Sequence, residues 1–180
     1  IRGDSGTTVI LTILRQGKED KFDVAVVRGK ITTINFEKLD NNVGVIYVNS
    51  FSAENPAIWN QMWDKVVEDV KNSGVEKLVI DLRGNPGGFL NSVSYALDDF
   101  LSIGDIRYKT AGKNGKILEV SRVDRVGSGR LQGLDIVVLI NGGSASAAEI
   151  FAGAIQAHER GKIIGEASFG KGSVQNVIEL

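Results

Sequence analysis

Cysteine is absent from this chain of 180 residues, and histidine occurs only once. Without cysteine there can be no disulfide bond, thiol nucleophile or cysteine-based zinc site, and a single histidine excludes metal sites that need two imidazoles. The charges nearly cancel, with 21 Lys and Arg against 22 Asp and Glu, whereas proteins dedicated to nucleic acids usually carry a basic excess. The composition therefore leaves chemistry based mainly on hydroxyl, carboxylate and amine groups.

Long apolar runs are also missing. The longest, near residues 43–48 and 136–140, are far shorter than the roughly 18 residues that a membrane-spanning helix needs. Apolar residues still make up 42% of the chain, which is enough to fill a core. Glycine is abundant, at 22 residues against two prolines, which is not a linker composition. The glycines indicate positions where the backbone needs conformational freedom.

The apolar pattern predicts two parts. Residues 7–36 are strand-like, with a hairpin of 8–14 and 22–27. From residue 43 onward, strands alternate with amphipathic helices, which predicts α/β layers around a largely parallel sheet. The expected strands are 43–48, 78–82, 106–109, 117–122, 135–140, 162–165 and 174–178, and the expected helices run from Pro56 to the residue before Gly74, over residues 90–101, and from Ser144 to His158.

Three glycine-rich loops, at residues 84–88, 141–146 and 170–173, each follow an expected strand. In open α/β sheets, ligand sites lie beyond the carboxyl ends of the strands, so we expect the loops to converge at one edge. Phosphate binding is excluded, because Gly172 stands where a P-loop needs Ser or Thr after its lysine, and residues 84–88 do not match the dinucleotide fingerprint.

Two serines, Ser144 and Ser146, lie at the expected start of a helix, where free backbone N–H groups can stabilise an oxyanion. Either serine could instead act only as a helix cap. His158 lies twelve residues after Ser146, roughly 18 Å along a continuous helix, so it cannot act as the base and is expected at the helix C-terminus. The remaining candidate base is Lys171, since Ser–Lys pairs are known when the lysine is neutral; the alternative is a solvated loop lysine.

Three segments together carry a family resemblance. Residues 78–88 include Asp-Leu-Arg-Gly-Asn-Pro-Gly-Gly, residues 141–150 begin Asn-Gly-Gly-Ser-Ala-Ser, and residues 165–175 end Gly-Lys-Gly-Ser-Val-Gln. In this order they resemble the motifs of the carboxyl-terminal processing peptidases, or tail-specific proteases, which are serine endopeptidases with a Ser–Lys dyad. The resemblance implies a layered α/β core similar to those of crotonases and Clp proteases.

The resemblance also implies site residues, cofactors and partners. Matched position by position, the roles are Ser146 as nucleophile, Lys171 as general base, Gln175 as the residue that orients this lysine, and the backbone N–H groups of Ala147 and of either Gly87 or Gly88 as the oxyanion hole. No metal or cofactor is implied. The implied partners are proteins or peptides with apolar C-terminal tails and no nucleic acid, and a homo-oligomer is compatible with the family. The implied location is outside the cytoplasm, in the periplasm, cell envelope or thylakoid lumen.

The resemblance extends to the start of the chain. Residues 1–36 are similar to the last part of a PDZ domain, which leaves residues 37–180 as the peptidase core, expected to be truncated at its C-terminal end. Two other functions stay open. A crotonase-like acyl-CoA enzyme would use similar glycine N–H groups but would normally carry acidic residues at the third loop. A non-catalytic scaffold that binds C-terminal tails would be expected to have lost Ser146, Lys171 or Gln175.

Overall fold

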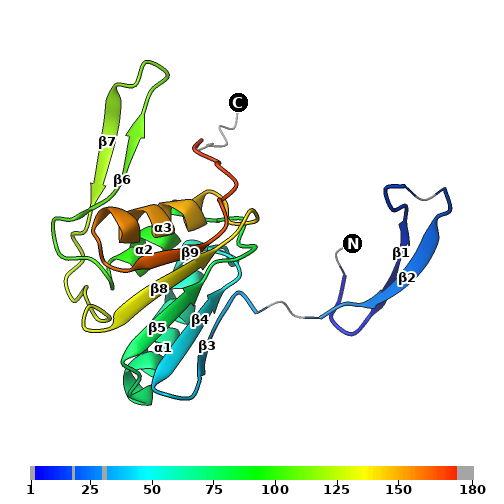
Figure 1. Cartoon of the computed structure of the whole chain (residues 1–180), viewed down its shortest axis with the longest axis horizontal. Helices are drawn as coiled ribbons and strands as arrows, with labels where there is room; N and C mark the ends of the chain where they lie inside the picture. The colour runs from blue at the N-terminus through cyan, green and yellow to red at the C-terminus, as the bar shows by residue number, and fades with distance from the viewer. Residues whose placement is uncertain (1–2, 18, 30–31, 174–180) are drawn as a thin grey trace. The chain divides into compact units, whose positions relative to one another are not determined.

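The computed structural model describes residues 3–17, 19–29 and 32–173 of the chain. These residues form two compact units, Ile1–Thr32 and Thr33–Leu180. The first unit is an antiparallel hairpin of β1 (Thr8–Ile13) and β2 (Phe22–Val27) (Figure 1). The alternating β-branched residues predicted this hairpin correctly.

A five-stranded sheet organises the second unit. Its strands are β3 (Ile34–Lys38), β4 (Val43–Val48), β5 (Lys77–Asp81), β8 (Asp135–Ile140) and β9 (Lys162–Gly165), in the spatial order β3-β4-β5-β8-β9. All neighbouring pairs are parallel except β3 with β4, which confirms the predicted, largely parallel sheet.

The edge strand β3 was not predicted as a separate element. It pairs with β4 along its whole length, so the two units divide after Thr32 and not after residue 36. The aromatic ring of Phe36 lies over Gly44, where an added methyl group would come within 2.6 Å of the ring. This contact fixes β3 on the sheet, and it depends on a partner that the local sequence does not reveal.

Three helices accompany the sheet: α1 (Pro56–Ser73), α2 (Leu90–Leu97) and α3 (Ala147–Ala157). The side chain of Asn55 accepts a hydrogen bond from the Ile58 N–H at 3.1 Å, and Gly74 ends α1 in the left-handed conformation. These start and stop signals were read correctly. Helix α2 is shorter than predicted, because the chain turns after Leu97 while residues 100 and 101 still enter the core.

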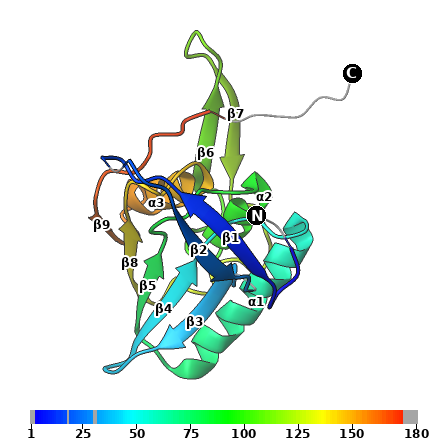
Figure 2. The same ribbon diagram turned by 90° about the vertical axis from the view of Figure 1, so that its right-hand side faces the viewer.

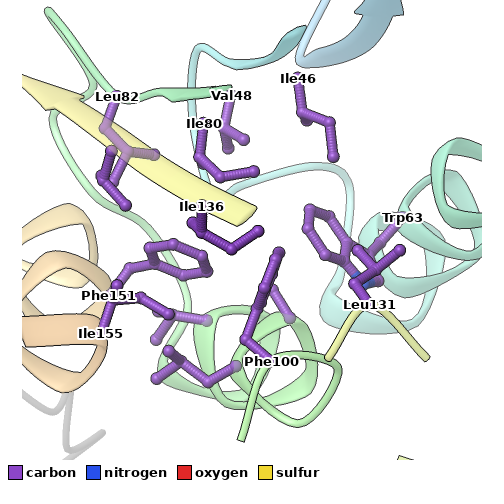
Figure 3. Packing of buried hydrophobic residues seen from close by; sticks show 14 of the residues in the cluster. Ile46, Val48, Trp63, Ile80, Leu82, Phe100, Leu131, Ile136, Phe151 and Ile155 are labelled. Carbon is purple, nitrogen blue, oxygen red and sulfur yellow. The ribbon is translucent and has the colours of Figure 1, made fainter. Parts of the chain in front are cut away.

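All three helices pack on one face of the sheet (Figures 1 and 2). Figure 3 shows the side chains that meet there, with Ile80 and Ile136 from the sheet near Phe100 and Phe151 from the helical layer. The rings of Phe100 and Phe151 meet edge to face at 5.4 Å. The core therefore lies between the sheet and the helices and leaves the carboxyl edge of the sheet to the loops.

A second antiparallel hairpin, β6 (Ile106–Ala111) and β7 (Ile117–Arg122), follows α2. Both of its strands were predicted, although β6 is two residues longer than expected. Within the described residues, the structure contains no helix that combines the length and the apolar character needed to cross a membrane.

A buried ion network joins this part of the chain to the core. Asp99 is fully buried, and its carboxylate accepts hydrogen bonds from the indole of Trp63 at 2.7 Å, from Arg125 at 2.8 Å and from Arg130 at 2.6 and 2.7 Å. The neighbouring Asp98 is paired with Arg107 at 2.7 Å. The network connects α1, the end of α2, β6 and the loop that precedes β8.

Replacing Asp99 by Ala is expected to lower the free energy of unfolding by about 3 kcal/mol, because the buried Trp63 indole N–H would lose its acceptor and the half-buried Arg125 and Arg130 would each lose one of their two carboxylate partners. Asp69→Ala is the matched control, since Asp69 pairs only with Lys65 at the surface, where such pairs contribute about 0–1 kcal/mol. Urea unfolding of both variants measures the difference. A similar, small effect for both would show that the buried network contributes little to stability.

Candidate active site

The three glycine-rich loops meet at the carboxyl edge of the sheet, as predicted. They follow β5, β8 and β9, which run in the same direction (Figure 1). The Ala145 N–H donates to the Asn85 carbonyl at 2.9 Å, and the Phe169 N–H donates to the Ser144 carbonyl at 2.9 Å. The middle loop is thus bonded to both of its neighbours, and the three loops form one site.

Ser146 occupies an unusual backbone conformation at the start of α3. Its φ is +55° and its ψ is −115°, a combination that residues with a side chain rarely adopt. The Glu149 N–H donates to the Ser146 carbonyl at 2.9 Å, and the Ser146 N–H donates to the Glu149 carboxylate at 2.7 Å, so both ends of this turn are held by residue 149. Strain of this kind is concentrated at functional sites, and a serine on a sharp turn before a helix is typical of a nucleophile.

Ser144 has a different environment. Its side chain is fully buried, and its hydroxyl donates to the Leu82 carbonyl at 2.8 Å and accepts from the Asn141 N–H at 3.0 Å. Both hydrogen bonds hold the middle loop against the first one. The hydroxyl of Ser144 therefore holds the loops together.

The carboxylate of Glu149 binds the third loop to the start of α3. One oxygen accepts from the Ser168 hydroxyl at 2.8 Å and from the Gly170 N–H at 2.7 Å. The other accepts from the Ser146 N–H at 2.7 Å and from the Lys171 N–H at 2.9 Å. The N–H groups of Ser146 and Lys171 therefore donate to the same oxygen atom of Glu149. Their nitrogens can be no further apart than the sum of the 2.7 Å and 2.9 Å hydrogen-bond lengths.

The charge of Glu149 is maintained by these contacts. Burial raises the pKa of its carboxyl, but the hydrogen bonds from Ser168 and from three backbone N–H groups lower it by more, so the pKa lies below the ordinary value of 4.5. Sequence reasoning assigned no role to this residue. The Ser-x-x-Glu spacing of a capping box was the signal that could have identified it.

The structure brings some of the residues considered for the site together at the carboxyl edge of the sheet, but not all of them. Ser146, Ala147, Gly87 and the backbone of Lys171 gather at this edge, and Lys171 is exposed. Gln175 and the expected strand 174–178 lie outside the described residues. His158 caps the far end of α3, with its Nε2 2.8 Å from the Ile106 carbonyl oxygen. The unbroken helix confirms that this histidine is not positioned to serve Ser146.

The two glycines of the first loop differ in their hydrogen bonding. The Gly87 N–H donates to the side chain of Asn85 at 2.8 Å, and Asn85 is itself buried and bound to the Val48 carbonyl. The N–H groups of Gly88 and Ala147 have no acceptor within the part of the chain that the structure describes. Gly88 and Ala147 are therefore the groups that can donate to a bound oxyanion.

Gly87 approaches Ser146 so closely that no side chain fits at position 87. A methyl group there would lie 2.8 Å from the Ser146 Cβ and 2.9 Å from the Ala147 nitrogen, at a φ of +100°. We expect Gly87→Ala to reduce catalytic activity at least about 100-fold, because even a 1 Å displacement can have that effect.

Gly84→Ala is the control, since Gly84 also has a positive φ but faces open space. It should lower stability by about 1–2 kcal/mol through backbone strain and leave activity within a few fold of the parent. Measurements of kcat/KM and of thermal unfolding separate the two effects. Equal activity of both variants would contradict the close approach at Gly87.

An ion pair marks the start of the first loop. Arg83 Nη2 lies 2.6 Å from Asp81 Oδ2, and the Arg83 N–H also donates to this carboxylate. Burial raises the pKa of Asp81, but the bonds from Arg83 outweigh it and keep the pKa below its usual value. Across the described residues, no group of three or more His, Asp or Glu side chains is arranged to hold a metal ion.

The sequence of this chain is similar to those of known proteins over its full length. Residues 42–180 match peptidase family S41. The chain is 37% identical over 182 residues to a carboxy-terminal-processing protease of Bartonella bacilliformis, covering all of this chain and 41% of that protein. It is 36% identical over 181 residues to a probable CtpA-like serine protease of Staphylococcus aureus, again over its full length and over 35% of the relative. The chain thus spans well under half the length of these relatives.

A solved structure shares the fold of this chain. The photosystem II D1 C-terminal processing protease superposes with a TM-score of 0.74 at 25% identity, covering 99% of this chain and 48% of that one. The fold class expected from the sequence is therefore confirmed, as is the resemblance on which the site residues were matched.

Proposed function

Because the chain belongs to peptidase family S41, we propose that the full-length protein is a serine endopeptidase that cleaves proteins near their C-termini. The observation that carries the proposal is the shared carboxylate oxygen of Glu149, which accepts from the N–H groups of both Ser146 and Lys171. This arrangement supports a nucleophile and a base that belong to one site, although they are 25 residues apart in the sequence.

In the proposed mechanism, the neutral amine of Lys171 takes the proton from the Ser146 hydroxyl. The serine oxygen attacks the peptide carbonyl, and the resulting tetrahedral intermediate collapses to an acyl-enzyme when Lys171 returns the proton to the leaving amine. Water then attacks the acyl-enzyme with Lys171 again acting as the base. Gln175, which lies outside the described residues, is proposed to orient the lysine.

The oxyanion of the intermediate is proposed to bind the N–H groups of Ala147 and Gly88. Ala147 is the first residue of α3, where backbone donors are unpaired and the helix dipole favours negative charge. Gly88 supports this role better than Gly87, whose N–H is already bonded to Asn85. Such donors contribute about 10²–10³-fold to the rate each.

The substrates, domain partner and location are proposals from the family. We propose substrates with apolar C-terminal tails, a PDZ domain to which the β1–β2 hairpin belongs and which captures such tails by strand addition, and a location outside the cytoplasm. The relatives are named for carboxy-terminal processing, and this chain contains three segments that resemble the motifs of that family.

The test is cleavage of fluorogenic peptides with apolar C-terminal tails by the full-length protein, with and without a metal chelator. Cleavage that the chelator does not affect is the expected result. Hydrolysis of an acyl-CoA thioester without peptide cleavage would favour the crotonase-like alternative. Tail binding with neither reaction would indicate a non-catalytic scaffold, and either of these outcomes would overturn the proposal.

A further inference from the structure

The loop that contains Lys171 is fixed at every residue from 168 to 171. Ser168, Gly170 and Lys171 each donate to Glu149, and the Phe169 N–H donates to the Ser144 carbonyl. These four hydrogen bonds are accepted by Glu149 and Ser144, which both lie within three positions of Ser146. Figure 1 shows this segment, after β9, passing one end of α3. The backbone of the loop is therefore tied to the turn that holds the nucleophile.

The side chain of Phe169 remains exposed on this fixed loop. Its exposed fraction is 70%, whereas Ser144, to which its backbone is bonded, is fully buried. Leaving a phenylalanine ring in water forgoes about 1.5–3 kcal/mol of stabilisation relative to burying it. Because the backbone is held by hydrogen bonds at Phe169 and at the residues after it, moving this backbone to bury the ring would break contacts between the loop and the start of α3.

The position of Phe169 limits what can cover the ring. Ser144 is two residues from Ser146, so their Cα atoms are at most about 7.6 Å apart. An extended peptide advances about 3.3 Å per residue, so a substrate bound at Ser146 has its nearest side chains within reach of the ring. An apolar side chain is the chemical partner that an exposed aromatic ring favours.

We infer that Phe169 is a specificity-determining residue that contacts an apolar side chain of the substrate within three residues of the scissile bond. The inference rests on the proposed peptidase function. The amino group of Lys171 and the ring of Phe169 would then face the same peptide, one acting on the bond and the other selecting the side chain beside it.

The experiment combines substitutions in enzyme and substrate. The cleaved bond of a leucine-rich peptide is first mapped with the full-length protein, and each of the three residues on either side of it is then changed to Gly in turn. The enzyme variants are Phe169→Ala, Phe169→Leu and the control Ile103→Ala, which removes an apolar side chain of equal exposure, 70%, from a loop outside the site. Peptide binding is measured in parallel on a Ser146→Ala background, which needs no cleavage.

We expect Phe169→Ala to lower kcat/KM about tenfold on the parent peptide and to have no effect on one Gly-substituted peptide, while Phe169→Leu and Ile103→Ala stay close to the parent enzyme. The same pairwise dependence should appear in binding. An equal loss on every peptide would show that Phe169 only supports the loop, and no loss would show that it makes no contact; both results overturn the inference. Absence of cleavage would refute the proposed function and this inference with it, whereas cleavage without any pairwise dependence would overturn this inference alone.

Discussion

Replacement of Ser146 by Ala is expected to reduce the peptidase activity of the full-length protein by at least about a thousandfold, because it removes the hydroxyl proposed to attack the peptide carbonyl. Lys171→Ala should be equally severe, since it removes the base. Lys171→Arg should also fail, as a guanidinium stays protonated and cannot accept a proton. Rates of peptide cleavage, with folding checked by circular dichroism, measure these effects.

Ser144→Ala is the matched control, because it removes the other serine hydroxyl of the same loop. Its hydroxyl bonds Leu82 and Asn141, so its removal should lower the free energy of unfolding by about 1–3 kcal/mol and leave activity within about tenfold of the parent. The nucleophile would be wrongly assigned if Ser144→Ala abolished cleavage while Ser146→Ala did not.

Glu149→Gln is expected to lower kcat about 100-fold with little change in overall fold. The amide that replaces the carboxylate has one acceptor oxygen, and its NH₂ group would face N–H donors, so two of the four hydrogen bonds are lost. Displacement of the Lys171 loop by even 1 Å accounts for the expected loss. Glu166→Gln, an exposed carboxylate on the same segment, should leave kcat unchanged. Comparable kcat values for both variants would refute the positioning role.

The pH dependence of order in the Lys171 loop provides a second test of the role of Glu149. Its pKa in the folded protein is lowered below the ordinary 4.5, so its contribution to stability is complete above that value and is lost as the pH falls through the lowered pKa. Order in residues 168–171 should therefore persist in mild acid and disappear only in stronger acid. Glu149→Gln should lack this acid transition, which amide chemical shifts of Gly170 can monitor.

The sequence signals that succeeded were local. Strands such as 135–140 and 162–165 are short apolar runs bounded by turn residues, and α1 has both a capping Asn55 and a terminating Gly74. The convergence of the three loops followed from the parallel order of the strands alone. Glycine-rich segments at the ends of strands therefore predicted correctly that the three loops meet at one edge of the sheet.

The features that were missed depend on residues far apart in the chain. Three of the four hydrogen bonds to Glu149 come from the loop that returns at Ser168, nineteen residues later. The pairing of β3 depends on the fit of Phe36 over Gly44. The network at Asp99 combines Trp63 with arginines at 125 and 130, and no periodicity connects those positions.

The edge strand β9 makes the site vulnerable to a local opening. It consists of four residues and pairs only with β8 among the described strands. Edge elements of this length open at a lower free energy than the core does. Each opening would carry the segment of Lys171 away from Ser146 while the rest of the sheet stays folded. Ser146 is also synthesised before Lys171, so a nascent or partly opened chain would contain Ser146 without its proposed base. The proposed peptidase activity would therefore require β9 to be docked on β8.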